Sequence, residues 1–314
     1  MHERLLMPLL HPVARFIGAA LLALAAPMVC AQTRDGSLYD ALADLSESAQ
    51  VSSGAQRAEA VVSLYERMVG TADPCAAAKL PFDEDDLFRA TVLAEGYSFD
   101  PRYVHKLGCL YARLQRQGRV TRWHIISYAD ALASISRFDA ANRILAALPT
   151  RPLAPLPTLA FERPLGSSRR VIDIVSPTHA VVRVFALHDD RLAILAVVHP
   201  DCHFSANALN AIVSSEDDRW LRERLVLLVA PGARPPIDGI AQWNRRQPML
   251  PMHLMYQRSD WAFLHSTVTP TFYLVRGSTI LETFAGWPNS DGLARMKAAL
   301  QRESAAEHGS RQRR

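Results

Sequence analysis

The sequence predicts an all-helical N-terminal part followed by an α/β sandwich. Apolar residues recur at helical spacing through residues 37–148, and prolines then cluster in residues 149–164. After the prolines, short apolar runs typical of strands alternate with helical segments. A chain of 314 residues is long enough for two domains. We therefore divide it into a helical domain at 32–148, a proline-rich linker at 149–166 and an α/β domain at 167–300.

The composition excludes several classes of protein. Hydrophobic residues make up 49% of the chain and charged residues 21%, which argues against whole-chain disorder and against a membrane protein with many spans. The net charge of +4 comes partly from arginines in the last residues, which we expect to form a basic flexible tail at 301–314. Lys and Arg do not interleave with aromatic residues along the body, so no nucleic-acid partner is expected.

The N-terminus is typical of a targeting signal. Arg4 and Arg15 flank an apolar run at 16–26, and small residues follow up to Ala31. The pattern predicts a secretory signal peptide at 1–31 that is cleaved after Ala31. A retained anchor is the alternative, although the run is shorter than the ~20 residues that a spanning helix needs. We expect a periplasmic or secreted protein with no stable membrane insertion after cleavage.

Cysteine usage follows from that expectation. Loss of Cys30 with the signal leaves Cys75, Cys109 and Cys202, an odd number in an oxidising compartment. Cys75 and Cys109 both lie in the helical region, so we predict a structural disulfide between them. Sequence alone does not give the distance between the two sulfurs. This pairing leaves Cys202 as a free thiol.

The helical region shows amphipathic faces and one hairpin pattern. Residues 128–149 resemble a single tetratricopeptide-like hairpin, with small residues where two helices cross and a proline at the end. A generic helical bundle is the alternative, and in either case the domain can offer a surface to a protein partner. The apolar faces comprise Ala58, Val61, Val62, Tyr65 and Met68, then Ile125, Ile126, Ala129, Leu132 and Ala133, then Phe138, Ala141, Ile144, Leu145 and Leu148.

The C-terminal region alternates predicted strands and helices. The run at 192–198 is apolar throughout, as expected for a strand that is buried on both faces of a sheet. The expected strands are 171–175, 181–187, 192–198, 225–230, 252–256, 271–275 and 280–285, and the expected helices are 204–214, 237–245 and 291–300.

Two motifs in this region indicate thiol chemistry. The buried strand ends at Val198, and a helix opens a few residues later, which places Cys202 at a helix N-terminus. Unpaired N–H groups and the helix dipole at that position favour a thiolate. Further along, Pro270 begins a strand although it has no N–H to give to a sheet, which indicates a special backbone feature.

These two motifs, in this order, resemble the thioredoxin fold over residues 171–300. The resemblance implies that Cys202 is the nucleophilic cysteine and that Pro270 is a cis-proline facing it. It further implies that Pro200 is the proline before the active site and that Gly286 closes the last strand. The backbone at Thr269 and Pro270 would then bind the substrate by pairing with a client chain.

The chain departs from the family pattern beside the cysteine. Ser205 stands where the family has its second, resolving cysteine, so a mixed disulfide on Cys202 has no neighbouring thiol to release it. Asp201 opposes ionisation of the thiol, whereas His203, if protonated, and the helix terminus favour it. The sign of the net pKa shift stays open. We predict Cys202, Ser205 and His203 as the catalytic group.

Other functions remain open. The predicted function is exported thiol–disulfide chemistry on a protein client through one cysteine, and a non-catalytic binding or scaffold module is the alternative. The tetrad at 202–205 also resembles the Cys-Gly-Phe-Ser of monothiol glutaredoxins, which hold an iron–sulfur cluster, but His203 replaces the glycine. A copper chaperone is a further alternative, because His199, Asp201, Cys202 and His203 offer ligands for copper or zinc. Adjacent residues at a helix start point in different directions, so we assign no metal and no cofactor.

Overall fold

The computed structural model describes residues 36–48, 54–76, 79–150, 154–163, 169–264 and 268–311. Residues 36–314 belong to one compact unit. The predicted signal peptide at 1–31 lies outside the described residues. None of the helices searched in the described segments has the length and apolar character that crossing a membrane requires.

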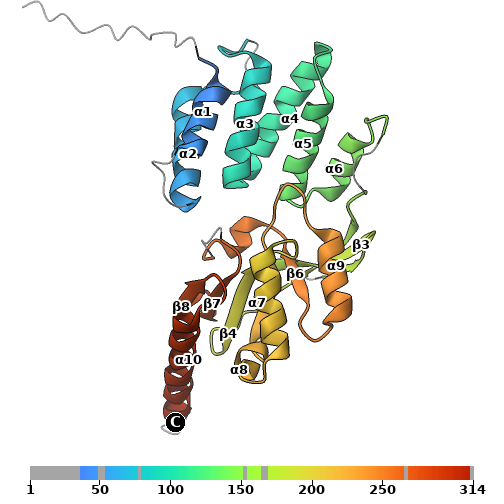
Figure 1. The fold of residues 1–314 in the computed structure, drawn as a ribbon. Helices are drawn as coiled ribbons and strands as arrows, with labels where there is room; N and C mark the ends of the chain where they lie inside the picture. Colours follow the sequence, from blue (N-terminus) through green and yellow to red (C-terminus); the bar gives the residue numbers. More distant parts are fainter. Residues whose placement is uncertain are drawn as a thin grey trace, which may run out of the picture. The chain divides into compact units, whose positions relative to one another are not determined.

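The first part of the unit is helical, and each helix packs against the next along the chain (Figure 1). Side chains of the expected apolar faces are buried, among them Val61, Tyr65, Ala129 and Leu132. The helices are α1 (Leu38–Glu47), α2 (Gly54–Val69), α3 (Glu84–Ser98), α4 (Pro101–Arg116), α5 (Arg122–Ser134) and α6 (Phe138–Leu145).

Capping residues set the ends of these helices. Asp83 accepts hydrogen bonds from the N–H groups of the first turn of α3, and Pro101 begins α4, where its missing N–H costs nothing. Ser136, in the left-handed region with φ 60°, turns the chain from α5 into α6. The predicted helical hairpin at 128–149 is confirmed by the packing of α5 on α6.

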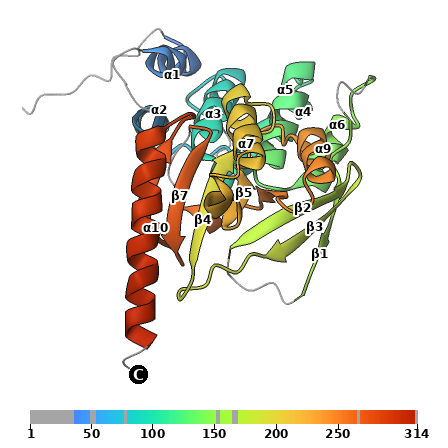
Figure 2. The same cartoon turned by 60° about the horizontal axis from the view of Figure 1, so that its bottom comes forward.

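Strands of the second part form one eight-stranded sheet in the order β1-β3-β2-β6-β5-β4-β7-β8 (Figure 2). Strand β4 is parallel to β5, β5 is parallel to β6, and β7 and β8 form an antiparallel hairpin beside β4. The strands are β1 (Thr158–Phe161), β2 (Arg170–Ser176), β3 (His179–Val184), β4 (Leu192–Val198), β5 (Leu225–Val229), β6 (Met252–Met255), β7 (Thr271–Arg276) and β8 (Thr279–Ala285).

The sheet is covered on both faces, which confirms the expectation for β4. Ile194, Ala196 and Val198 share a buried cluster with side chains of the helices α7, α9 and α10, whereas Leu195 and Val197 belong to the cluster on the other face. The helices of this part are α7 (His203–Ser214), α8 (Arg219–Arg222), α9 (Ile237–Arg246) and α10 (Ser290–Arg311), with a 3-10 turn η1 (Arg258–Trp261).

Two segments differ from the prediction. Within the proline-rich segment 149–166, residues 158–161 form β1 and pair with β3, because this short run contains no proline and lies at the sheet edge. The tail expected to be flexible from residue 301 instead continues α10 to Arg311. That stretch is rich in residues with high helix propensity, and its Glu303 makes a 2.9 Å ion pair with Arg276 of β7.

Candidate active site

Cys202 lies in the short connection between β4 and α7. It is the N-cap residue of α7, with φ −86° and ψ 120°, and its carbonyl accepts a 2.9 Å hydrogen bond from the N–H of Ala206. The Cys202 N–H donates in turn to the carbonyl of His199 at 3.0 Å. The thiol is therefore held at a helix N-terminus, where the sequence placed it.

The residues before β7 lie against this thiol. The Thr269–Pro270 peptide bond is cis, as expected, and the Cys202 Sγ lies 3.6 Å from the Thr269 carbonyl oxygen. Val197 at the end of β4 pairs with Thr271 at the start of β7. This antiparallel pairing brings the end of β4 next to the start of β7, so the two sequence motifs lie at the same end of the two strands.

The surroundings of Cys202 change its acidity. Burial raises the pKa of the thiol, but interactions with the Thr269 side chain, with Ser205 and with the Phe204 N–H outweigh burial and lower the pKa below its usual value. The direction of the pKa shift, which the sequence left open, is therefore downward, and this favours the thiolate form. The lowered pKa favours nucleophilic attack near neutral pH.

Ser205 is a buried residue with a structural contact. Its Oγ accepts a 3.2 Å hydrogen bond from the backbone N–H of His199, across the loop that carries Cys202. The hydroxyl thereby fixes the loop, and it also helps to lower the Cys202 pKa. Among the residues that the structure describes, Cys202 is the free cysteine, so no second thiol lies within this turn.

The polar neighbours of Cys202 do not converge on one point. His203 is exposed, and its Nε2 lies 3.0 Å from the Asn207 amide one turn along the same helix. His199 Nδ1 accepts from the N–H of Asp201 at 3.3 Å. Of the residues described, the side chains whose ligand atoms lie close enough to share a metal ion are elsewhere, in the helical part. His199, Asp201 and His203 are not grouped with Cys202 in this way among the described residues.

Cys202 opens into a cleft of about 800 Å³ that the helical part and the sheet line together. The sequence motifs give no indication of the helical contribution, because those residues come from far earlier in the chain. On the helical side the lining residues are Gly54, Ala55, Arg57, Ala58, Gly96, Tyr97 and Phe99, and on the sheet side they include His199, Asp201, Cys202, Arg234, Arg258 and Thr269.

Two arginines that line this cleft contact residues of the helical part. The Arg258 guanidinium lies 5.5 Å from the centroid of the Phe99 ring, and burial lowers the pKa of Arg258. Arg234 makes a 3.2 Å ion pair with Asp130 of α5. The cleft thus offers aromatic surface and positive charge beside the thiol.

Exposed apolar side chains occur in both motifs. Phe204, two residues after Cys202, is 57% exposed, and Val268, the residue before Thr269, is 55% exposed. Behind the thiol, Gly239 of α9 allows close packing, because a Cβ there would lie 2.9 Å from the Cβ of Pro200. The helix and the loop therefore approach each other without a side chain between them.

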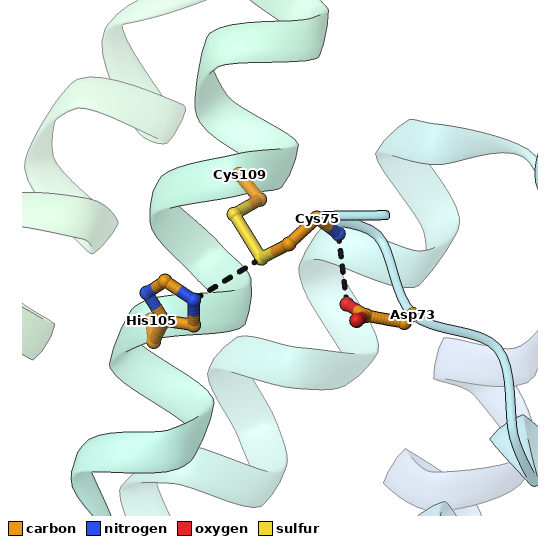
Figure 3. Close-up of a disulfide and its surroundings, with 4 residues drawn as sticks. All are labelled: Asp73, Cys75, His105 and Cys109. Atoms are coloured by element: carbon orange, nitrogen blue, oxygen red, sulfur yellow. Dashed lines mark hydrogen bonds between the residues drawn. A yellow bond between two sulfur atoms is a disulfide. The ribbon is translucent and has the colours of Figure 1, made fainter. Parts of the chain in front are cut away.

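The other two cysteines of the described segments form a disulfide in the helical part. Cys75, in the loop between α2 and α3, is bonded to Cys109 of α4, and Asp73 accepts a 2.9 Å hydrogen bond from the Cys75 N–H (Figure 3). The bond closes a loop with a sequence separation of 34. Loop entropy of this size stabilises the folded state by about 3 to 4 kcal/mol.

Comparisons with known proteins add one distant structural likeness. No protein-family model matches the sequence, and no curated protein matches it. Among solved structures, the chain is similar to a thioredoxin-like protein from Bacteroides caccae, with 13% identity and a TM-score of 0.28, over 84% of this chain and 76% of that one. In the present chain, the β4-α7-β5 unit is followed by the β7-β8 hairpin and α10, with Cys202 after β4 and cis-Pro270 before β7. This order of elements, with the cysteine and the cis-proline in these places, is the one that the resemblance to the thioredoxin fold predicts.

Proposed function

We propose that this protein carries out thiol–disulfide chemistry on a protein client through the single thiol of Cys202. The observation that carries the proposal is the position of the thiol. It lies at the N-terminus of α7, has a lowered pKa, and opens into the cleft. Reactive cysteines combine a lowered thiol pKa with partial exposure, and a helix N-terminus is one of the environments that lower the pKa.

The proposed reaction balances in two steps. The Cys202 thiolate attacks one sulfur of a client disulfide, so a new S–S bond joins Cys202 to the client, and the other client sulfur leaves as a thiolate that takes up a proton. An external thiolate then attacks the mixed disulfide and forms a new S–S bond with the sulfur that it attacks. Attack on the Cys202 sulfur releases the client thiolate, attack on the client sulfur releases the Cys202 thiolate, and the released thiolate takes up a proton. With a client sulfenic acid, the first step instead releases water.

Ser205 makes the first product long-lived. The family's resolving position holds a hydroxyl that is already committed to the N–H of His199. A hydroxyl does not displace a thiolate from a disulfide, so the covalent adduct waits for an outside thiol. The unaltered protein should therefore accumulate adducts with its clients.

The test is non-reducing electrophoresis of cells that express the protein. The wild type should give high-mass species that disappear with reductant and with Cys202→Ser. Ser205→Cys should shorten their lifetime, because it adds a resolving thiol one helical turn from Cys202. As a matched control, Ser214→Cys adds an exposed thiol at the far end of the same helix, roughly 18 Å from Cys202 at about 1.5 Å per residue, and should leave the lifetime unchanged. Absence of Cys202-dependent adducts would remove the enzymatic proposal.

A non-catalytic binding module is the second candidate, and the cleft favours it. Tyr97 and Phe99 bring aromatic surface to the lining and Arg258 brings a cation, and Phe204, two residues after Cys202, is exposed. Such surfaces are enriched where proteins bind partners. If Phe99→Ala with Arg258→Gln abolishes partner capture while Cys202→Ser preserves it, the binding function stands and the thiol is dispensable.

Export forms a separate part of the proposal. The charged, apolar and small-residue pattern at 1–31 supports cleavage of a signal peptide and release into the periplasm or medium. N-terminal sequencing of the fractionated protein tests this, and a mature chain that begins after Ala31 is the expected result. A full-length chain in the membrane fraction would instead indicate a retained anchor.

A further inference from the structure

A second cluster of sulfur and nitrogen atoms lies in the helical part, away from the sheet. Ligand atoms of Cys75, His105 and Cys109 all lie within 4.8 Å of one another. His105 and Cys109 stand one helical turn apart on α4, and the loop before α3 brings Cys75 beside them (Figure 3). Two helical residues at this spacing project from the same face of the helix.

One nitrogen–sulfur distance in the cluster is already close to that in a zinc site. The His105 Nε2 lies 3.4 Å from the Cys75 Sγ. A tetrahedral zinc ion with Zn–S of about 2.3 Å and Zn–N of about 2.0 to 2.1 Å separates its sulfur and nitrogen ligands by about 3.6 Å. The histidine therefore already stands at ligand distance from one sulfur. The two sulfurs would need to separate to about 3.8 Å, which rotation of the exposed Cys75 side chain can supply.

The disulfide is accessible to the reagent that would open this site. Cys75 and His105 are exposed, and Cys109 is half-buried. A small dithiol can attack one sulfur, displace the other as a thiol, and leave as its own cyclic disulfide, so two electrons pass to the protein and two thiols form. A divalent metal that then binds both sulfurs releases two protons to solvent.

We infer that reduction of the Cys75–Cys109 disulfide converts this cluster into a zinc site with Cys75, His105 and Cys109 as ligands. Two thiolates and one neutral imidazole are ligands that Zn²⁺ prefers, and two thiolate charges neutralise the ion. The fourth position would take water or the carboxylate of Asp73, which lies on the same loop as Cys75. The same three residues would thus serve as a covalent bond in one redox state and as a metal site in the other.

The experiment uses the Cys202→Ser protein, so that the active-site thiol does not contribute and the outcome is independent of the proposed function. Reduced protein is titrated anaerobically with Co²⁺ as a spectroscopic probe and then with Zn²⁺. We expect one equivalent of Co²⁺ with thiolate charge-transfer absorption and tetrahedral visible bands, and displacement of that signal by Zn²⁺. The oxidised protein should give neither.

Variants separate a built site from a pair of reactive thiols. His105→Ala should weaken Zn²⁺ binding at least tenfold and change the Co²⁺ spectrum, whereas the control His179→Ala removes an exposed histidine outside the cluster and should change neither. Circular dichroism of the reduced protein shows whether the helices persist. Equal metal binding by the oxidised and the reduced protein would overturn the inference. Metal binding by the reduced protein that His105→Ala leaves unchanged would also overturn it, because an unfolded chain with two free thiols would give the same result.

Discussion

The helical part and the sheet use the same two residue types in opposite ways. In the helices, two cysteines pair in an exposed disulfide, while beside the sheet Cys202 stays single and half-buried at a helix N-terminus. Carboxylates differ in the same manner. Burial raises the pKa of Glu95 in α3 to about 7, although Ser134 donates a hydrogen bond to it. Surroundings, rather than residue type, decide what each group can do.

Asp173 in β2 shows the opposite electrostatics. Burial alone would raise its pKa, but hydrogen bonds and charges from His253 and Arg183 lower it below the usual value. If folding raises the pKa of a carboxyl, the free energy of unfolding falls as pH rises towards the folded-state pKa. If folding lowers the pKa, the free energy of unfolding falls as pH decreases through the folded-state pKa. Glu95 and Asp173 should therefore make the stability of the fold depend on pH in opposite directions.

The largest expected effect tests the contrast between the two sulfur sites. Replacing Cys75 and Cys109 together by Ser should lower the free energy of unfolding by about 3 to 4 kcal/mol, because the closed loop is lost. Urea unfolding measures the loss. At urea concentrations below the unfolding transition, Cys202 should be alkylated at the wild-type rate. For the unfolding measurement, Cys202→Ser is the control, because it removes a sulfur without opening a covalent loop. A slowed Cys202 reaction in native buffer would mean that the two sites depend on each other.

Glu95→Gln tests the helical acid. Its folded-state pKa of about 7 lies above the ordinary value of 4.5, so wild-type stability falls as pH rises between these values. The amide removes that loss, and the variant should match the wild type near pH 5 and exceed it by about 2 to 3 kcal/mol at pH 8. Urea unfolding at both pH values measures this, with Glu59→Gln, an exposed position on α2, as control. A constant difference at both pH values would contradict the prediction.

Asp173→Asn should show the reverse dependence. The wild-type carboxylate stabilises the fold above its unfolded-state pKa, and that stabilisation disappears as pH falls through the lowered folded-state pKa. We expect the substitution to lower the free energy of unfolding by about 1 to 2 kcal/mol at pH 7. The effect is modest because the carboxylate is partly exposed and screened by solvent, and it should become smaller in acid, where the carboxylate is protonated. Asp190→Asn, at an exposed loop position, is the control. A cost that grows as pH falls would refute the assignment.

Ser205→Ala gives the smallest expected change. It removes a contact that lowers the Cys202 pKa and deprives the His199 N–H of its acceptor. The thiol pKa should rise, and alkylation at pH 7 should slow by less than about tenfold. The pH profile of the iodoacetamide rate measures the shift, and Ser214→Ala at the far end of α7 should leave it in place. An unchanged profile would show that Ser205 acts on the loop alone.

Local signals predicted much of the fold. The apolar run of β4 and the strand beginning at Thr271 are each encoded within a short stretch, and the structure places both as expected. The Cys75–Cys109 pair was expected because both cysteines lie in the helical region. The β1 strand was missed because flanking prolines dominate its neighbourhood, and the last turns of α10 were missed because charged residues there equally suit a tail. Local pattern therefore identifies elements better than it identifies where they end.

The candidate site divides in the same way. Cys202 and Pro270 were found because each follows or precedes a recognisable strand. Phe99 and Arg258 were not found, because their contact depends on how the helices pack on the sheet and no short motif encodes it. The structural role of Ser205, buried against the His199 N–H, was likewise hidden, since a sequence shows only the missing cysteine.

Strand β4 has a consequence for how the thiol experiences thermal motion. Its backbone is hydrogen-bonded to β5 on one side and β7 on the other, and its side chains are buried on both faces. Amide protons in such a strand exchange with solvent mainly when the whole domain unfolds. Strand β4 ends at Val198, and Cys202 follows four residues later. The end of β4 that carries the Cys202 loop should therefore stay in place during the local opening of loops. The orientation of the thiol should then persist until the whole domain unfolds.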